Sequence, residues 1–179
     1  MRSMRREKMN SGTLYEEVIS RNSETVYRLA YSLVRTRSDA DDIYQEVFLR
    51  YVRKNPVFDS AEHEKAWFMR VTVNCCKNFW KSPWMQRRNA FEDDVLEQGG
   101  LDNRMVSGNA DEDQFLIETV KQLPEKYRVV IHLFYYEELS VEEIGKITRS
   151  KASTVRTRLT RARRLLKSLL KEEGEGFDV

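Results

Sequence analysis

Residues suited to metal or redox chemistry are scarce in this sequence. Its 179 residues include 2 cysteines and 2 histidines. The cysteines, Cys75 and Cys76, are adjacent, and no repeated CxxC spacing that would suit a metal ion accompanies them. We therefore expect two reduced thiols on a helix, with no metal site and no cofactor.

Long apolar runs are also missing. The amino terminus, MRSMRREKMN, is basic, but no apolar segment follows it, as a signal peptide would require. No stretch approaches the roughly 18 apolar residues of a membrane-spanning helix. The sequence therefore predicts a cytoplasmic protein without direct membrane insertion.

Glycine and proline, which weaken helix interiors, number only 7 and 3. Hydrophobic residues make up 40% of the chain and charged residues 34%, a balance typical of folded domains. Because long charged segments with few helix breakers favour helices, we expect an all-α protein. A chain of this length holds two domains only if each is small.

Three helical patterns fill the first part of the chain. The first runs over about 14–34, with Asn22 as a candidate break. Ser38 is a good N-cap for the second helix, which Pro56 brings to an end. The third is expected over about 62–81. Together these segments predict a small helical bundle.

A second helical part follows a segment that has no sustained period. Pro124 suits the first turn of a helix. Ser140 and Glu143 form a capping box that starts a short helix, and a last long helix follows Ser150. We therefore expect two small helical domains, at 13–82 and 111–172, joined by a flexible acidic linker at 83–110.

Charge is segregated along the chain, although the net charge is only +2. Residues 149–171 carry nine basic side chains and no acidic one, whereas residues 89–118 carry nine acidic side chains and one basic one. The basic block can meet phosphates, while the acidic block is repelled by them or mimics them. This asymmetry indicates a phosphate-bearing partner for the last helix.

The last two helices have the pattern of a helix-turn-helix. Apolar positions of the second helix recur at spacings of 4, 3 and 4, which marks one face: Val155, Leu159, Ala162 and Leu166. The opposite face is rich in arginine and hydroxyl groups, which suit base edges and phosphates of the major groove. The candidate DNA-binding residues are Ser153, Arg156, Thr157, Arg158, Thr160, Arg161, Arg163 and Arg164. Those expected nearest the bases are Arg156, Thr157, Thr160 and Arg161.

Three stretches resemble conserved regions of the bacterial sigma-70 family of RNA polymerase sigma factors. Residues 39–54, DADDIYQEVFLRYVRK, resemble the second region of that family, and residues 66–80, AWFMRVTVNCCKNFW, resemble its promoter-melting segment. The fourth region resembles LPEKYRVVIHLFYYEELSVEEIGKITRSKASTVRTRLTRARRLLK (123–167). The turn departs from the family, because Gly145 replaces a frequent Ala and Thr148-Arg149 replaces a frequent Leu-Gly. The absence of a middle domain points to the extracytoplasmic-function (ECF) group.

This resemblance implies a protein that directs RNA polymerase to promoters and is not an enzyme. The implied partners are core RNA polymerase, through its beta-prime clamp coiled coil and its beta flap, promoter DNA and an anti-sigma factor. No small-molecule substrate is implied. A helix face built from positions i, i+3, i+4 and i+7 would dock on the clamp as a mixed polar and apolar stripe. Its members are Asp42, Gln45, Glu46 and Leu49.

A second face, on the helix over 62–81, is expected to bind the melted minus-ten element. Amides can read base edges, aromatic rings can stack on bases and lysines can follow the backbone. The candidates are Trp67, Arg70, Asn74, Lys77, Asn78 and Lys81, of which Trp67 suits the core equally well. The preceding loop forms a pocket for a flipped base in the family, and Phe58 is its candidate wall. The fourth region would read the minus-thirty-five element.

Two other functional classes stay open from the sequence. A stand-alone helix-turn-helix regulator would bind an operator without polymerase, but it leaves DDIYQEVF unexplained. A nuclease could use Asp41 and Asp42, or the acidic run at 92–94. Adjacent carboxylates on a helix point about 100° apart, so they do not converge on one metal ion without other ligands.

Overall fold

The computed structural model describes residues 2–83, 85–86 and 118–174. The principal helices are α1 (Arg2–Leu33), α2 (Arg37–Lys54), α3 (Ala61–Trp80), α6 (Glu125–Tyr135), α7 (Val141–Thr148) and α8 (Ala152–Gly174). No strand occurs within these described ranges, which confirms the all-α prediction. Most of the expected linker, 83–110, lies outside the described residues.

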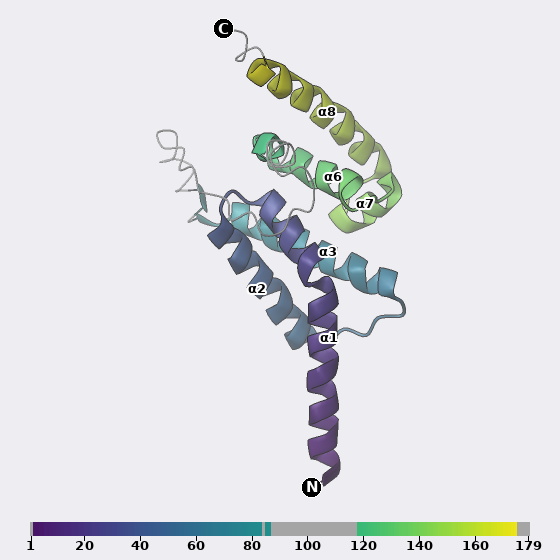
Figure 1. Cartoon of the computed structure of the whole chain (residues 1–179). Helices are drawn as coiled ribbons and strands as arrows, with labels where there is room; N and C mark the ends of the chain where they lie inside the picture. The colour runs from purple at the N-terminus through teal and green to yellow at the C-terminus, as the bar shows by residue number, and fades with distance from the viewer. Residues whose placement is uncertain (1, 84, 87–117, 175–179) are drawn as a thin grey trace.

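The helices form two packed groups (Figure 1). Helices α1, α2 and α3 pack against one another, and so do α6, α7 and α8. The groups also touch, because α3 contacts α7 and α1 contacts α6. The amino-terminal end of α1 lies far from the second group, and the carboxyl-terminal end of α8 lies at the opposite end of the molecule (Figure 1).

Local capping explains the helix boundaries in the first group. The Thr36 hydroxyl accepts a hydrogen bond from the Asp39 amide at 3.1 Å and caps α2, whereas Ser38 lies inside the first turn. The prediction of Ser38 as the cap was therefore wrong, because the extended backbone that a cap requires occurs two residues earlier. Ser60 caps α3 in the same way, and α2 ends at Asn55 in the left-handed conformation.

Helix α1 is longer than predicted and runs unbroken through Asn22, so the candidate break was wrong. The Asn22 amide donates to the Val18 carbonyl oxygen at 2.9 Å and to Glu64 Oε1 at 2.6 Å. Its side chain thus finds partners without disturbing the backbone ladder, which removes the main reason for asparagine to end a helix.

Glu64 joins α3 to α1 through a largely buried carboxylate. Arg21 donates to it from Nε at 2.7 Å and from Nη2 at 2.6 Å, beside the bond from Asn22. The bonds from Arg21 hold the pKa of Glu64 below its usual range, although burial opposes this effect. The contact therefore fixes the amino-terminal half of α3 on α1.

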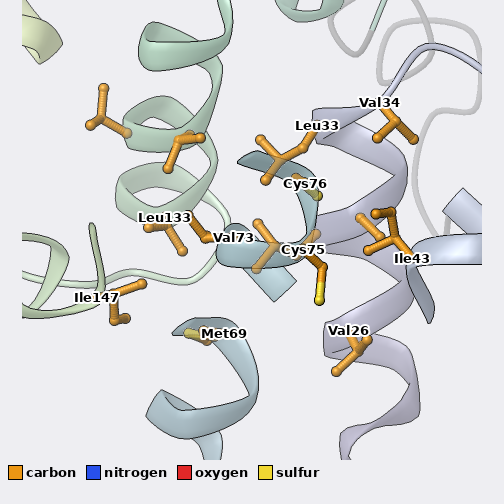
Figure 2. Close-up of a cluster of buried hydrophobic side chains, with 14 of the residues drawn as sticks. Val26, Leu33, Val34, Ile43, Met69, Val73, Cys75, Cys76, Leu133 and Ile147 are labelled. Atoms are coloured by element: carbon orange, nitrogen blue, oxygen red, sulfur yellow. The ribbon is translucent and has the colours of Figure 1, made fainter. Parts of the chain in front are cut away.

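The apolar core continues from the first group into the second. Figure 2 shows Met69 and Val73 of α3 between Val26 of α1 and two residues of the other group, Leu133 and Ile147. All five side chains are at most 3% exposed. The two groups therefore share a dry interface centred on α3.

The contact between Glu64 and Arg21 yields a stability prediction. We expect Glu64→Gln to lower the free energy of unfolding by about 1–3 kcal/mol at neutral pH, because charge-assisted hydrogen bonds become neutral ones. The folded-state pKa of Glu64 is lowered, so the stabilisation is complete above the unfolded pKa and disappears as the pH falls below about 4. Urea unfolding followed by circular dichroism at several pH values measures this. The exposed Glu16→Gln is the control, and an equal loss in both variants would contradict the prediction.

Candidate polymerase and nucleic-acid interfaces

The unit formed by α7, the turn and α8 is built by local interactions. Ser140 Oγ accepts from the Glu143 amide at 3.2 Å, and Glu143 Oε2 accepts from the Ser140 amide at 2.8 Å, which confirms the predicted capping box. Helix α7 ends at Arg149, whose φ is 55°. A Cβ atom at Gly145 would lie 2.8 Å from the Ser150 carbonyl oxygen. Glycine therefore lets the chain turn closely enough to seat α8 against α7.

Helix α8 is buried on one side and exposed on the other. Val155, Leu159 and Ala162 are at most 3% exposed, and Leu166 is partly buried against the same core. Seven of the eight candidate DNA-binding residues are exposed, and Arg158 is half-buried. The predicted apolar stripe is therefore where the periodicity placed it, and the arginine-rich face is open to a partner.

Two arginines at the flanks of that face have partners within the protein. Arg156 pairs with Glu142 of α7 at 2.9 Å, and both side chains are largely exposed. Arg163 Nε donates to the Tyr135 hydroxyl at 2.7 Å. An exposed ion pair contributes less than about 1 kcal/mol, so Arg156 can exchange Glu142 for DNA at little cost.

A cleft of about 260 Å³ opens between the amino-terminal end of α6 and α8. Its lining residues are Lys126, Tyr127, Thr154, Thr157, Arg158 and Arg161. Three of them are cationic, three carry a hydroxyl group and none is acidic, a combination that suits an anion such as a DNA phosphate. Lys126 was not among the candidates from sequence, because it lies on a helix distant in the chain from α8.

The candidate polymerase-binding residues share one accessible face of α2. Asp42 and Gln45 are exposed, and Leu49 is 48% exposed. Glu46 pairs with Arg50 at 2.6 Å along the helix surface. The i, i+3, i+4 and i+7 spacing thus brings these side chains to one surface.

A groove of about 320 Å³ lies beside this face, between α1 and α2. It is lined by Ile19, Tyr44, Gln45, Phe48, Leu49 and Val52. Leu49 and Val52 are both 48% exposed, so the groove presents apolar surface to solvent. Sequence reasoning missed the wall that Ile19 supplies, because it depends on α1 lying alongside α2.

The candidates on α3 differ in exposure. Asn78 and Lys81 are exposed, whereas Trp67, Arg70, Asn74 and Lys77 are half-buried. Arg70 Nε is buried and has no hydrogen-bond partner among the described residues. Lys77 Nζ donates to the Thr148 carbonyl oxygen at the end of α7, at 3.2 Å. In this arrangement, Lys77 is therefore engaged by the second helical group.

Phe58 and Trp67 lie in an aromatic cluster at the amino-terminal end of α3. The ring centroid of Phe58 is 5.8 Å from that of Trp67 and 6.4 Å from that of Tyr51. Trp67 also contacts Phe68 edge-on, with centroids 5.0 Å apart. Both Phe58 and Trp67 are half-buried, so each supports the core and also reaches the surface.

Two sequence profiles match the chain in order. Sigma-70 region 2 matches residues 18–85, and Sigma-70 region 4 matches residues 116–166. The ECF RNA polymerase sigma-E factor of Escherichia coli strain K12 is 32% identical over 136 residues, which cover 70% of this chain and 70% of that protein. The chain belongs to the sigma-70 family. Region 2 contains α2 and α3, and region 4 contains α6, α7 and most of α8.

A second relative is also an RNA polymerase sigma factor, and a solved structure shares the fold. RNA polymerase sigma factor SigV of Bacillus subtilis strain 168 is 29% identical over 170 residues, which cover 94% of this chain and 98% of that protein. The fold resembles that of the sigma factor RpoE of Bartonella quintana, solved in complex with the anti-sigma factor NepR. The TM-score is 0.65 at 21% identity, over 88% of this chain and 96% of that one.

Sequence reasoning also missed the charged contact between regions 2 and 4. Glu137 follows α6, and its side chain is fully buried. Its Oε1 lies 2.6 Å from Arg28 Nη2 of α1, and its Oε2 lies 3.1 Å from Lys65 Nζ of α3. A loop residue carries no helical periodicity, so nothing in the sequence distinguishes Glu137 from the exposed Glu138 beside it.

The described residues contain no group of three or more His, Cys, Asp and Glu side chains able to hold a metal ion. Cys75 and Cys76 are buried in α3. Burial raises the pKa of Cys75 to about 11 and also raises that of Cys76, so both thiols stay protonated and unreactive at neutral pH. None of the helices in the described ranges has the length and apolar character required to cross a bilayer.

Proposed function

We propose that this sigma-70 family member binds core RNA polymerase, directs it to specific promoters and has no catalytic activity of its own. The observation that carries the proposal is the separation of chemically distinct exposed faces on one chain. An acidic and apolar face on α2 suits a protein partner, and a basic, hydroxyl-rich face on α8 suits DNA. Such a protein works in the cytoplasm.

The α2 face and its groove are the proposed site for the beta-prime clamp coiled coil. Leu49 and Val52 supply apolar area beside the groove, and Asp42 and Glu46 supply negative charge. Apolar anchors surrounded by charge give both affinity and orientation. Region 4 is the proposed site for the beta flap, and an anti-sigma factor is the proposed inhibitor, as NepR accompanies the similar RpoE.

The amino-terminal half of α8 is proposed to enter the major groove of the minus-thirty-five element. The hydroxyls of Thr157 and Thr160 donate to backbone carbonyls one turn earlier, at 3.0 Å each, so they offer methyl groups and lone pairs to the DNA. Arg156 and Ser153 would lie beside them at the bases. Because Arg161 lines the cationic cleft with Lys126, we assign it to a backbone phosphate rather than to a base.

The exposed strip of α3 is the proposed site for the melted minus-ten element. Asn74 and Asn78 would contact unpaired bases, and Lys81 would contact the backbone. Trp67 and Phe58 would border the same strip from the aromatic cluster at the other end of the helix.

The decisive experiment for the proposed function combines a pull-down of core RNA polymerase with run-off transcription from a promoter library. A sigma factor makes transcription depend on the protein and on promoter sequence. A stand-alone regulator would instead bind DNA without polymerase and support no initiation.

Polymerase binding should depend on the α2 face. We expect Asp42→Arg combined with Glu46→Arg to weaken association with core polymerase at least 100-fold, because reversed charges at a docked face cost several kcal/mol. The fold should persist, since loss of the surface pair between Glu46 and Arg50 costs less than about 1 kcal/mol. Binding is measured by fluorescence anisotropy, with Lys54→Glu on the same helix as the charge-reversal control. Unchanged affinity of the folded double variant would exclude this face.

Base and phosphate contacts of α8 should respond differently to substitution. Within the holoenzyme, we expect Arg156→Ala to cost about 1–3 kcal/mol and to relax specificity at one position of the minus-thirty-five element. Lys126→Ala and Arg161→Ala should weaken all promoter variants alike and lower the salt slope by about one each. Binding to a promoter panel at several salt concentrations separates these effects, with Lys171→Ala as the control. If Arg161→Ala changes sequence preference instead, its assignment to the cleft phosphate is wrong.

A further inference from the structure

Beside the shared apolar core, one buried carboxylate joins region 4 to region 2. Glu137 lies in the loop after α6, and its carboxylate bridges Arg28 of α1 and Lys65 of α3 at 2.6 and 3.1 Å. His132 Nε2 of α6 is 3.6 Å from the same carboxylate. This side chain thus contacts α1 and α3 from a single point.

The surroundings keep Glu137 ionised. Burial alone would raise its pKa, but His132 and Arg28 beside the carboxylate outweigh burial and hold the pKa at about 2. The carboxylate is therefore fully charged at neutral pH. A buried charge of this kind is stable only while its partners stay in place, so separation of the regions must replace Arg28 and Lys65 with water.

Other polar contacts across the interface are weaker. Lys77 of α3 donates to the Thr148 carbonyl oxygen at 3.2 Å, where it meets the negative end of α7. Lys121 Nζ lies 3.8 Å from the centroid of the Tyr31 ring of α1. These contacts extend the interface, but neither contains a paired charge from each region.

The same interface contains an unfavourable feature. Arg128 of α6 is 4% exposed, and its Nε and Nη1 atoms have no hydrogen-bond partner among the described residues. Its nearest aromatic neighbour is Trp80 of α3, with the guanidinium carbon 5.9 Å from the ring centroid. Burial lowers the pKa of Arg128, the negative charge of Glu125 in the same helix partly opposes this, and the positive charge of Arg35 in region 2 lowers the pKa further. Separation of the regions would hydrate this cation.

The closed arrangement is geometrically incompatible with simultaneous reading of both promoter elements. The minus-ten and minus-thirty-five elements are roughly 25 base pairs apart, which is about 80 Å along duplex DNA at 3.4 Å per base pair. In the closed form, Lys77 of the minus-ten face is 3.2 Å from Thr148, at the end of the helix before α8. The regions must therefore separate before one molecule engages both elements.

We propose that Glu137 is the latch of an autoinhibited closed form, and that Arg128, which has two buried nitrogens without a hydrogen-bond partner in the same interface, favours opening. The effect of the latch on transcription rests on the proposed function, whereas the latch itself is a property of the free protein. Removal of Glu137 or of its partner Arg28 releases region 4, and removal of the Arg128 charge retains it.

The test uses the full chain in small-angle X-ray scattering, with circular dichroism to establish that each variant is folded. We expect the radius of gyration to increase in Glu137→Gln and in Arg28→Gln. Combining the two substitutions should increase it little further, because each breaks the same contact between Arg28 and Glu137. Arg28→Gln leaves region 4 unaltered, so it separates opening from unfolding of that region. The exposed neighbour Glu138→Gln is the matched control and should stay as compact as the wild type. If both variants are folded and as compact as the wild type, the proposal that Glu137 is a latch is wrong.

The role of Arg128 is tested by affinity for core polymerase. Full engagement of core polymerase, by region 4 as well as by α2, requires the open form. The apparent affinity therefore rises with the open fraction, and Glu137→Gln should bind at least five-fold more tightly than the wild type. Arg128→Met, which keeps the length of the side chain, should bind at least five-fold more weakly. Equal or tighter binding by Arg128→Met would overturn its role in opening. Run-off transcription by the wild-type protein tests the proposed function independently, because scattering by the free chain requires neither polymerase nor DNA.

Discussion

Helix α3 packs against α1 and α2 on one side and against α7 on the other. Met69, Val73 and Cys76 are at most 1% exposed, so the middle of the helix belongs to the shared core. The strip that carries Asn74 and Asn78 is the part of α3 proposed to meet DNA. One helix of 20 residues supports both regions and also carries the proposed melting surface. Residues that pack in the core and residues proposed to open the promoter are therefore neighbours on α3.

The charges around this helix are unevenly balanced. Glu137 neutralises cations at the amino-terminal half of the interface, while the other half gathers positive side chains. Burial lowers the pKa of Lys77, and the charges of Arg158, Lys81 and Arg149 lower it further. Promoter phosphates would neutralise these cations better than the facing region does. Under the proposed function, DNA would therefore bind the open form more tightly than the closed form, and a ligand needs such a difference in order to shift a conformational equilibrium.

Sequence reasoning succeeded where structure is determined locally. The capping box at Ser140 and the apolar stripe of α8 depend on residues within a few turns of one another, and both are present in the structure. The cap of α2 was misplaced by two residues, because Thr36 and Ser38 have similar side chains and differ only in backbone conformation. Asn22 was read as a break, because its partner Glu64 is 42 residues away.

The candidate faces illustrate the same limit. Spacing along one helix identified the exposed side chains of α2 and α8, since a single helix fixes which residues share a face. Spacing could not reveal the groove that Ile19 completes from α1, the cleft that Lys126 completes from α6, or the contact of Glu137 with region 2. Each of these joins side chains from segments far apart in the chain, so it exists only once the tertiary fold has formed.

The position of the α2 groove bears on how a closed molecule could meet polymerase. The groove is lined by α1 and α2 alone, whereas region 4 contacts region 2 through α1 and α3. The proposed clamp site is therefore accessible while Glu137 is still buried. Docking at α2 does not itself require opening, but engagement of region 4 and of both promoter elements does. Under the proposed function, polymerase would first capture the closed form, and contacts available only to separated regions would then supply the free energy that releases Glu137.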